Sequence, residues 1–258
     1  MKRLPLTFAC EDSTLAGTLD TAPASVGLLI VSGGNEIRSG AFSGQARLAA
    51  RIAKAGFPVF RFDRRGIGDS EGENRGFRKS RKDIVAALDA FRAMAPQMNR
   101  VVGFGNCDAA SALMIAGGAG CDSLVLSNPW TIEGDDDAIP PPGAVRARYA
   151  EKLKNPKELA RLVTGKVDLG KLARGIARAA RPKAPAGSLA RELEAGLASF
   201  DAPVRILLAE ADRTAQAFAA VWDPADERVA YCKGATHAYV EPHARDWLDR
   251  QLLAALRG

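Results

Sequence analysis

The sequence lacks long apolar runs and has few residues of the kinds that bind metals or form disulfides. No stretch approaches the ~20 consecutive apolar residues of a membrane span. The basic residues after Met1 are not followed by the apolar segment of a secretory signal. The 4 cysteines stand far apart without a C-x-x-C pair, and there are only 2 histidines. We therefore expect a reduced, cytoplasmic protein with no disulfide framework, metal site or cofactor.

What the chain does contain is typical of a globular protein. Its 258 residues are 47% hydrophobic and 26% charged, enough for one large α/β domain. Short apolar runs alternate with helical patterns, which predicts a mostly parallel sheet with right-handed crossovers. The runs that predict buried strands are 26–31, 57–62, 100–104, 123–126, 204–209 and 227–232. Residues 6–10 and 15–19 predict an antiparallel pair at one edge.

The alternation of strand and helix breaks between Trp130 and Ser199. This stretch is rich in Arg, Lys, Ala and Leu and has no strand signal. We interpret 131–199 as a helical cap inserted after the fourth buried strand, with 1–130 and 200–258 forming the core. Such a cap would cover the carboxyl ends of the strands, where open α/β sheets bind ligands. Its basic residues would suit an acyl carrier protein, a CoA ester or an anionic membrane surface, although charged runs are usually solvated helical faces.

Cys107 is the most informative single residue. An apolar run leads into Gly105-Asn106-Cys107-Asp108-Ala109, and a helical pattern of small residues follows. This is the strand, sharp turn and helix of a nucleophile elbow, with a thiol in place of the usual hydroxyl. The turn exposes the nucleophile and requires small neighbours at Gly105 and Ala109. The helix aims unpaired N–H groups at the reaction centre.

A cysteine nucleophile needs a base and an acid that orients the base. His237 follows the last strand and is the favoured base, whereas His243 lies at the start of a helix. Asp212 follows the strand 204–209 and is the favoured acid over Glu210, which still belongs to the strand end. The chain order nucleophile, acid, base is the order expected after such an elbow.

Backbone groups are expected to bind the oxyanion. One donor is the N–H of Asp108, and the other is the N–H of Asn35 or Gly34 in the loop after the first buried strand. The candidates to line a substrate pocket are Asn106, Trp130 and Glu36.

Gly68-Asp69-Ser70-Glu71-Gly72 satisfies the G-x-S-x-G pattern literally. No strand comes immediately before it and no helix opens on it, so the context that the motif requires is missing. We expect Ser70 to have a structural role.

Several segments together resemble one family over nearly the full length of the chain. They are Gly33–Gly40, Phe62–Gly72, Gly105–Ser111, Asn128–Trp130, Leu162–Leu169 and Asp212–Gln216. The sequence resembles the exosortase A system-associated hydrolases, which are α/β-hydrolase-fold proteins. The resemblance implies that fold and a Cys107–Asp212–His237 triad. This chain differs from the family pattern at Asn106, where a larger apolar residue is usual, and at Arg64, where an aromatic residue is usual.

A thiol nucleophile forms a thioester intermediate. A helix N-terminus and an imidazolium favour the thiolate, whereas the Asp108 carboxylate opposes it. The sequence favours a cysteine-dependent hydrolase of esters or thioesters, acting on a small or carrier-bound acyl substrate and not on nucleic acid. An acyltransferase that uses the same triad is an alternative, because thioesters react readily with amines, alcohols and thiols. A catalytically silent protein that binds an acyl ligand or a partner is the third possibility.

Overall fold

The computed structural model describes residues 2–133 and 187–258. The strands are β1 (Arg3–Cys10), β2 (Ser13–Asp20), β3 (Val26–Val31), β4 (Val59–Phe62), β5 (Arg100–Asn106), β6 (Ser123–Ser127), β7 (Val204–Ala209) and β8 (Val229–Cys232). The α-helices are α1 (Gly44–Lys54), α2 (Arg81–Met94), α3 (Asp108–Ile115), α7 (Ser188–Ala198), α8 (Arg213–Val221) and α9 (Pro242–Arg257), and short 3-10 helices are η1 (Ala41–Ser43), η2 (Phe77–Lys79) and η3 (Gly117–Gly120).

The strands form one 8-stranded sheet in the order β1-β2-β4-β3-β5-β6-β7-β8. β3 to β8 run parallel, and β1 and β2 add an antiparallel pair at one edge. The predicted fold class and edge pair are confirmed. β4 begins two residues later than predicted because Pro58, which has no N–H, precedes it. β8 also begins late, because the N–H of Arg228 donates to the Asp226 side chain in a turn.

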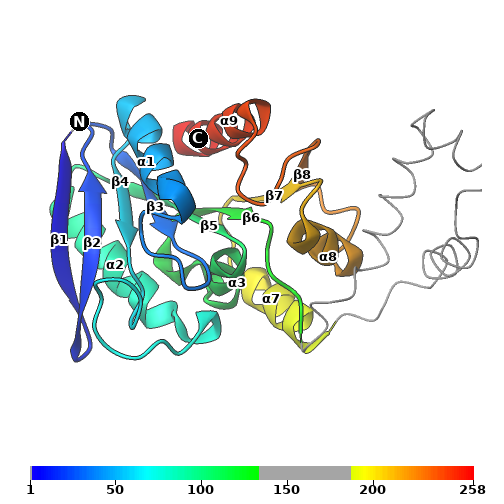
Figure 1. Ribbon diagram of the computed structural model, residues 1–258, viewed down its shortest axis with the longest axis horizontal. Coiled ribbons are helices and arrows are strands. Elements are labelled where there is room, and N and C mark those ends of the chain that lie inside the picture. The colour runs from blue at the N-terminus through cyan, green and yellow to red at the C-terminus, as the bar shows by residue number, and fades with distance from the viewer. Residues whose placement is uncertain (1, 134–186) are drawn as a thin grey trace, which may run out of the picture.

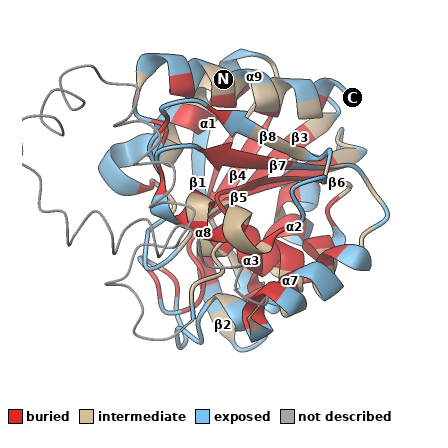
Figure 2. Cartoon of the chain, turned by 90° about the vertical axis from the view of Figure 1, so that its right-hand side faces the viewer, coloured by how far each residue is buried: buried red, intermediate tan, exposed pale blue. Residues whose placement is uncertain are grey.

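The alternation of side chains along each strand divides the core between the two faces of the sheet. In β3, Leu29 and Val31 pack in one cluster with α2, α3, α7 and α8, whereas Leu28 and Ile30 pack in another with α1 and α9. Figure 1 shows these helices on either side of the sheet. Figure 2 shows the buried strands between helices whose outer faces are exposed. Two apolar faces explain why the strands read as continuous hydrophobic runs.

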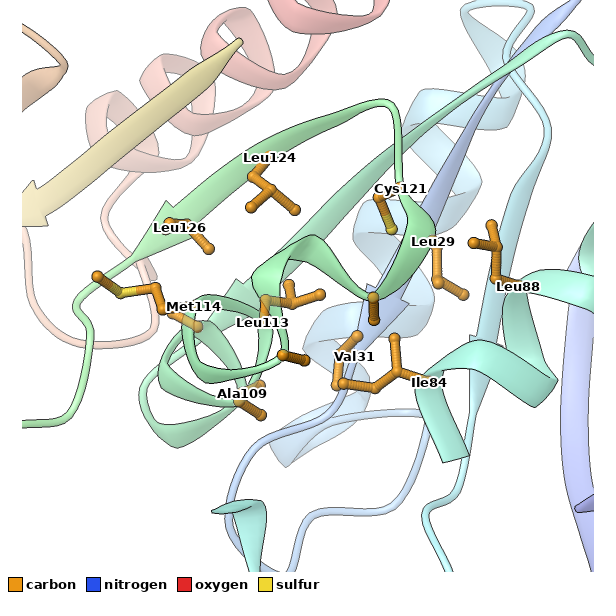
Figure 3. Packing of buried hydrophobic residues seen from close by; sticks show 14 of the residues in the cluster. Leu29, Val31, Ile84, Leu88, Ala109, Leu113, Met114, Cys121, Leu124 and Leu126 are labelled. Carbon is orange, nitrogen blue, oxygen red and sulfur yellow. The ribbon is translucent and has the colours of Figure 1, made fainter. Parts of the chain in front are cut away.

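Helix α3 fits closely against the sheet. Leu113 and Met114 point toward β6 residues Leu124 and Leu126, and Ala109 lies near Val31 of β3 (Figure 3). The small residues Ala109 and Ala110 follow Asp108 in the first turn of α3, which lets the helix begin directly above the strand ends. The packing therefore determines where the N-terminus of α3 points.

Most of the predicted cap, 134–186, lies outside the described residues, and so does most of the basic segment considered for carrier docking. Its C-terminal end is described: α7 contains the buried residues Leu189, Leu193 and Leu197 and packs against α3. Ser188–Ala198 thus belongs to the same core cluster as the sheet. Helix α8 had no counterpart in the predictions. In the two described ranges, no helix is long and apolar enough to cross a bilayer.

Candidate active site

Cys107 lies at the turn between β5 and α3. Its φ of 63° and ψ of −130° are unusual for a residue with a side chain. A Cβ on Gly105 would lie 2.6 Å from the carbonyl carbon of Ala109, so the turn requires glycine there. The Cys107 N–H donates to Ser127 O at 2.9 Å and ties the turn to β6. This is the strained backbone of a nucleophile elbow, and it leaves the Cys107 side chain partly exposed.

Asp212 and His237 meet at the same edge of the sheet. His237 Nδ1 lies 3.0 Å from Asp212 Oδ2. Asp212 is buried and caps α8, because Oδ2 also accepts from the Ala215 N–H at 3.0 Å. This cap holds the carboxylate in place, so it can orient the imidazole.

The Cys107 side chain lies close enough to the His237 imidazole to contribute to its pKa. The bond to Asp212, followed by the interaction with Cys107, raises the pKa of His237 from its ordinary 6.5 to about 10, against the opposing effect of burial. With Nδ1 turned to Asp212, Nε2 is the ring nitrogen left for the thiol. The arrangement favours an imidazolium beside Cys107 at neutral pH.

The other histidine and the other cysteines lie elsewhere. His243 Nε2 lies 3.0 Å from the Lys233 carbonyl oxygen on the surface. Cys10, Cys121 and Cys232 are buried, and burial raises the pKa of Cys121 to about 12. A groove of about 670 Å³ between β1 and α2 is lined in part by Cys10 and Phe8 and contains no triad residue. Among the described residues, no group of His, Cys, Asp and Glu could hold a metal ion.

The two predicted oxyanion loops lie against each other. A Cβ on Gly33 would lie 2.7 Å from Asp108 Oδ1 and 2.8 Å from Asn106 O, so the loop after β3 touches the elbow. The N–H of Gly34 donates to Asp108 Oδ1 at 2.5 Å and is therefore already used. Asn35, the next residue, remains as the donor candidate in this loop.

The residues proposed for a pocket have different environments. Trp130 is partly buried, and its N–H and C=O both bond the hydroxyl of the buried Ser111, at 2.7 and 2.9 Å. Glu36 is exposed and lies 3.5 Å from Gln45 Nε2. The hydrogen bonds of these two residues within the described part of the chain lead away from Cys107 and His237.

Asn106 contacts the histidine loop. Its Nδ2 donates to the His237 carbonyl at 3.3 Å, and its Oδ1 accepts from Asn128 at 2.9 Å. Asn128 is fully buried, also donates to the His237 carbonyl at 3.3 Å, and accepts from the Ala209 N–H at 2.8 Å. Two amides thus link the turn at Cys107, β7 and the loop that carries His237. Asn128 was not predicted as a site residue, although it lies directly after a strand and belongs to the segment Asn128–Trp130 that carries part of the family resemblance.

Arg64 is a second residue that was not predicted to belong to the site. Its side chain is buried, its Nη2 lies 3.7 Å from Asp108 Oδ2, and its Nη1 donates to Ser80 Oγ at 3.0 Å. Nη2 also donates to the Gly34 carbonyl. A buried cation is therefore paired with the acid that follows Cys107. The departure of Arg64 from the family pattern was its only signal in the sequence.

Comparison with known proteins identifies the architecture. The model of the family described as "Alpha/beta hydrolase family" matches residues 28–250. The alpha/beta hydrolase GrgF from Penicillium sp. sh18 is 18% identical with a TM-score of 0.62, over 98% of this chain and 97% of that one. The esterase Pf2001 of Pyrococcus furiosus is 16% identical with a TM-score of 0.61, over 100% and 92% of the two chains.

Est1E from Butyrivibrio proteoclasticus, solved with ferulic acid bound, is 16% identical with a TM-score of 0.58, over 98% of this chain and 100% of that one. No curated protein matches the sequence. At these identities the solved structures establish the shared fold.

Proposed function

The chain belongs to the alpha/beta hydrolase family, and we propose that it is a cysteine-dependent acyl hydrolase that cleaves esters or thioesters through an acyl-thioenzyme. The observation that carries this proposal is the meeting of three groups: Cys107 in a strained turn, His237 close enough to Cys107 for the two to interact, and Asp212 at 3.0 Å from His237. Within the family we propose the exosortase A system-associated type, on the motifs around Cys107, Arg65 and Asp212.

In the first half-reaction, the Cys107 thiolate attacks the carbonyl carbon of the substrate. The new C–S bond gives a tetrahedral oxyanion, which the N–H groups of Asp108 and Asn35 stabilise. Collapse breaks the bond to the leaving oxygen or sulfur, and the His237 imidazolium gives that atom its proton. The product is a thioester on Cys107.

In the second half-reaction, the now neutral His237 accepts a proton from water as the water attacks the thioester carbonyl. Collapse of the second tetrahedral intermediate releases the carboxylic acid and regenerates the thiolate beside an imidazolium. Asp212 stabilises the imidazolium in both steps and remains ionised. An amine, alcohol or thiol in place of water would give acyl transfer.

Intact-mass spectrometry after exposure to a panel of acyl-CoA thioesters and p-nitrophenyl esters tests the proposal. We expect one acyl adduct, mapped to Cys107, together with released free acid when no acceptor is added. Cys107→Ala should abolish both adduct and turnover. Cys232→Ala, at the end of β8, is the matched control and should retain both.

Each other outcome points to a different function. An adduct that clears only when an amine or alcohol is added would indicate an acyltransferase. The absence of any adduct or turnover with the whole panel would overturn the proposal in favour of a binding protein. Turnover that persists in Cys107→Ala would exclude Cys107 as the nucleophile.

A further inference from the structure

An ion pair between the buried Arg64 and the partly buried Asp108 lies directly beside the proposed nucleophile. Asp108 follows Cys107 in the chain, and its Oδ2 is 3.7 Å from Arg64 Nη2. The Arg64 side chain is only 5% exposed and that of Asp108 15%. Arg64 comes from the loop after β4, and Asp108 begins α3. The pair therefore joins two segments that are far apart in sequence.

The same two side chains hold the loop that carries the second oxyanion donor. Asp108 Oδ1 accepts from the Gly34 N–H at 2.5 Å, and Arg64 Nη2 donates to the Gly34 carbonyl. Both the N–H and the carbonyl of Gly34 are therefore hydrogen-bonded. Its φ of 54° is a conformation that favours glycine. Asn35 follows immediately, so its N–H is oriented by a backbone that Arg64 and Asp108 fix from two directions.

The electrostatics explain why both members are needed. The Asp108 carboxylate holds Gly34, but a negative charge next to Cys107 opposes the thiolate and the oxyanion of the reaction. Arg64 is permanently charged, and it offsets that field because its guanidinium is buried and lies 3.7 Å from the partly buried Asp108 carboxylate. Without Arg64, the Asp108 charge that holds Gly34 would disfavour the Cys107 thiolate and the oxyanion.

We propose that Arg64 is a positioning residue for the reaction, which neutralises the effect of Asp108 on Cys107 and, through Gly34, orients the Asn35 N–H. This inference rests on the proposed role of Cys107 as the nucleophile. Other charged groups face the site from other elements. His237 and Asp212 form their own pair, and Arg78 of η2, which packs against α3, is paired with Glu133 and Glu192.

The pH dependence of Cys107 alkylation by iodoacetamide tests the charge effect without requiring turnover. Arg64→Met should raise the pH of half-maximal alkylation by about one unit, because Asp108 is left uncompensated. Asp108→Asn should lower it by about the same amount, because Arg64 is left uncompensated while the amide oxygen still accepts from Gly34. The double variant should return close to the parent's value.

Arg64→Lys separates charge from orientation. It keeps the positive charge, so the alkylation midpoint should stay near the parent's value. It loses the forked contact to Gly34 and Asp108, so kcat on a p-nitrophenyl ester should fall about tenfold with little change in KM, since oxyanion contacts act mainly in the transition state. The Tm of each variant reports folding.

Shifts in the same direction for Arg64→Met and Asp108→Asn, or unchanged midpoints in both, would overturn the inference. If Arg64→Met does not fold, the downward shift in Asp108→Asn and the kcat loss in Arg64→Lys still decide the question. A protein that alkylates as expected but turns over no ester or thioester would support the charge role of Arg64 and count against the hydrolase proposal alone. The two failures are therefore distinguishable.

Discussion

Ser70 and Cys107 both follow strands that end at the same edge of the sheet, yet only Cys107 has the backbone of a nucleophile. The Ser70 hydroxyl is buried, donates to Asp63 O at 2.7 Å and accepts from the Ala16 N–H at 2.9 Å. Cys107 has a positive φ, a helix begins at the next residue, and its side chain contributes to the raised pKa of His237. In the G-x-S-x-G segment at 68–72, the Ser70 hydroxyl therefore connects the loop after β4 to β2. A nucleophile motif is defined by the strand, turn and helix around it.

Among the changes that test this contrast, we expect the largest loss of activity from substitution of Asp212, the acid proposed to act with Cys107. Asp212→Asn removes the charge that stabilises the imidazolium, and we expect kcat/KM to fall about 10²- to 10⁴-fold. Glu210→Gln, two residues earlier on an exposed side chain, is the matched control and should change kcat/KM less than about threefold. An equal loss in both variants would contradict the assignment of Asp212.

The second prediction concerns pH and the charge on His237. Its pKa is raised to about 10, so the protonated form is favoured in the folded protein. The stabilisation is therefore fully present below about pH 6.5 and is lost as pH rises through about 10. Urea unfolding over this range should show that the excess stability of the parent over His237→Gln shrinks as pH rises. His243→Gln, at the surface, should show no such trend, and a flat difference for His237→Gln would contradict the prediction.

The smallest effect on catalysis should come from Ser70. Ser70→Ala leaves the Ala16 N–H without its partner in a buried position, which costs about 1–3 kcal/mol of unfolding free energy. We expect the urea midpoint to fall while kcat/KM stays within about twofold, since surrounding structure keeps the elbow intact. A Ser70→Ala protein that folds but has no activity would contradict the structural role assigned to Ser70.

Much of the fold could be predicted because its signals are local. Runs such as 204–209 alternate with helical patterns, and each strand's apolar residues are adjacent in the sequence. The elbow was equally readable, because Gly105, Cys107 and Ala109 lie within one turn. The start of β4 was predicted less well, because Pro58 decides it through a missing hydrogen bond.

The contacts that complete the site were not predictable in the same way. Arg64 and Asp108 belong to different strand ends, and nothing in either local sequence specifies the other. Asn128 and Asn106 reach the His237 carbonyl from β6 and β5. Asn106 was expected to line a pocket because it is adjacent to Cys107 in the sequence. Its hydrogen-bond partners, Asn128 and the His237 carbonyl, could not be inferred from the sequence.

The sequence by itself determined the succession of strands along the chain, the strand, turn and helix around Cys107 and the candidates His237 and Asp212, since these follow from periodicity, turn chemistry and the scarcity of histidine. Tertiary structure alone decided that Gly34 is occupied by Asp108, that Arg64 compensates this acid, and that two amides hold the histidine loop. The physical reason is range. Periodicity and turns act between neighbours, whereas buried charges and hydrogen bonds are satisfied by whichever groups the packed sheet brings within about 3 Å.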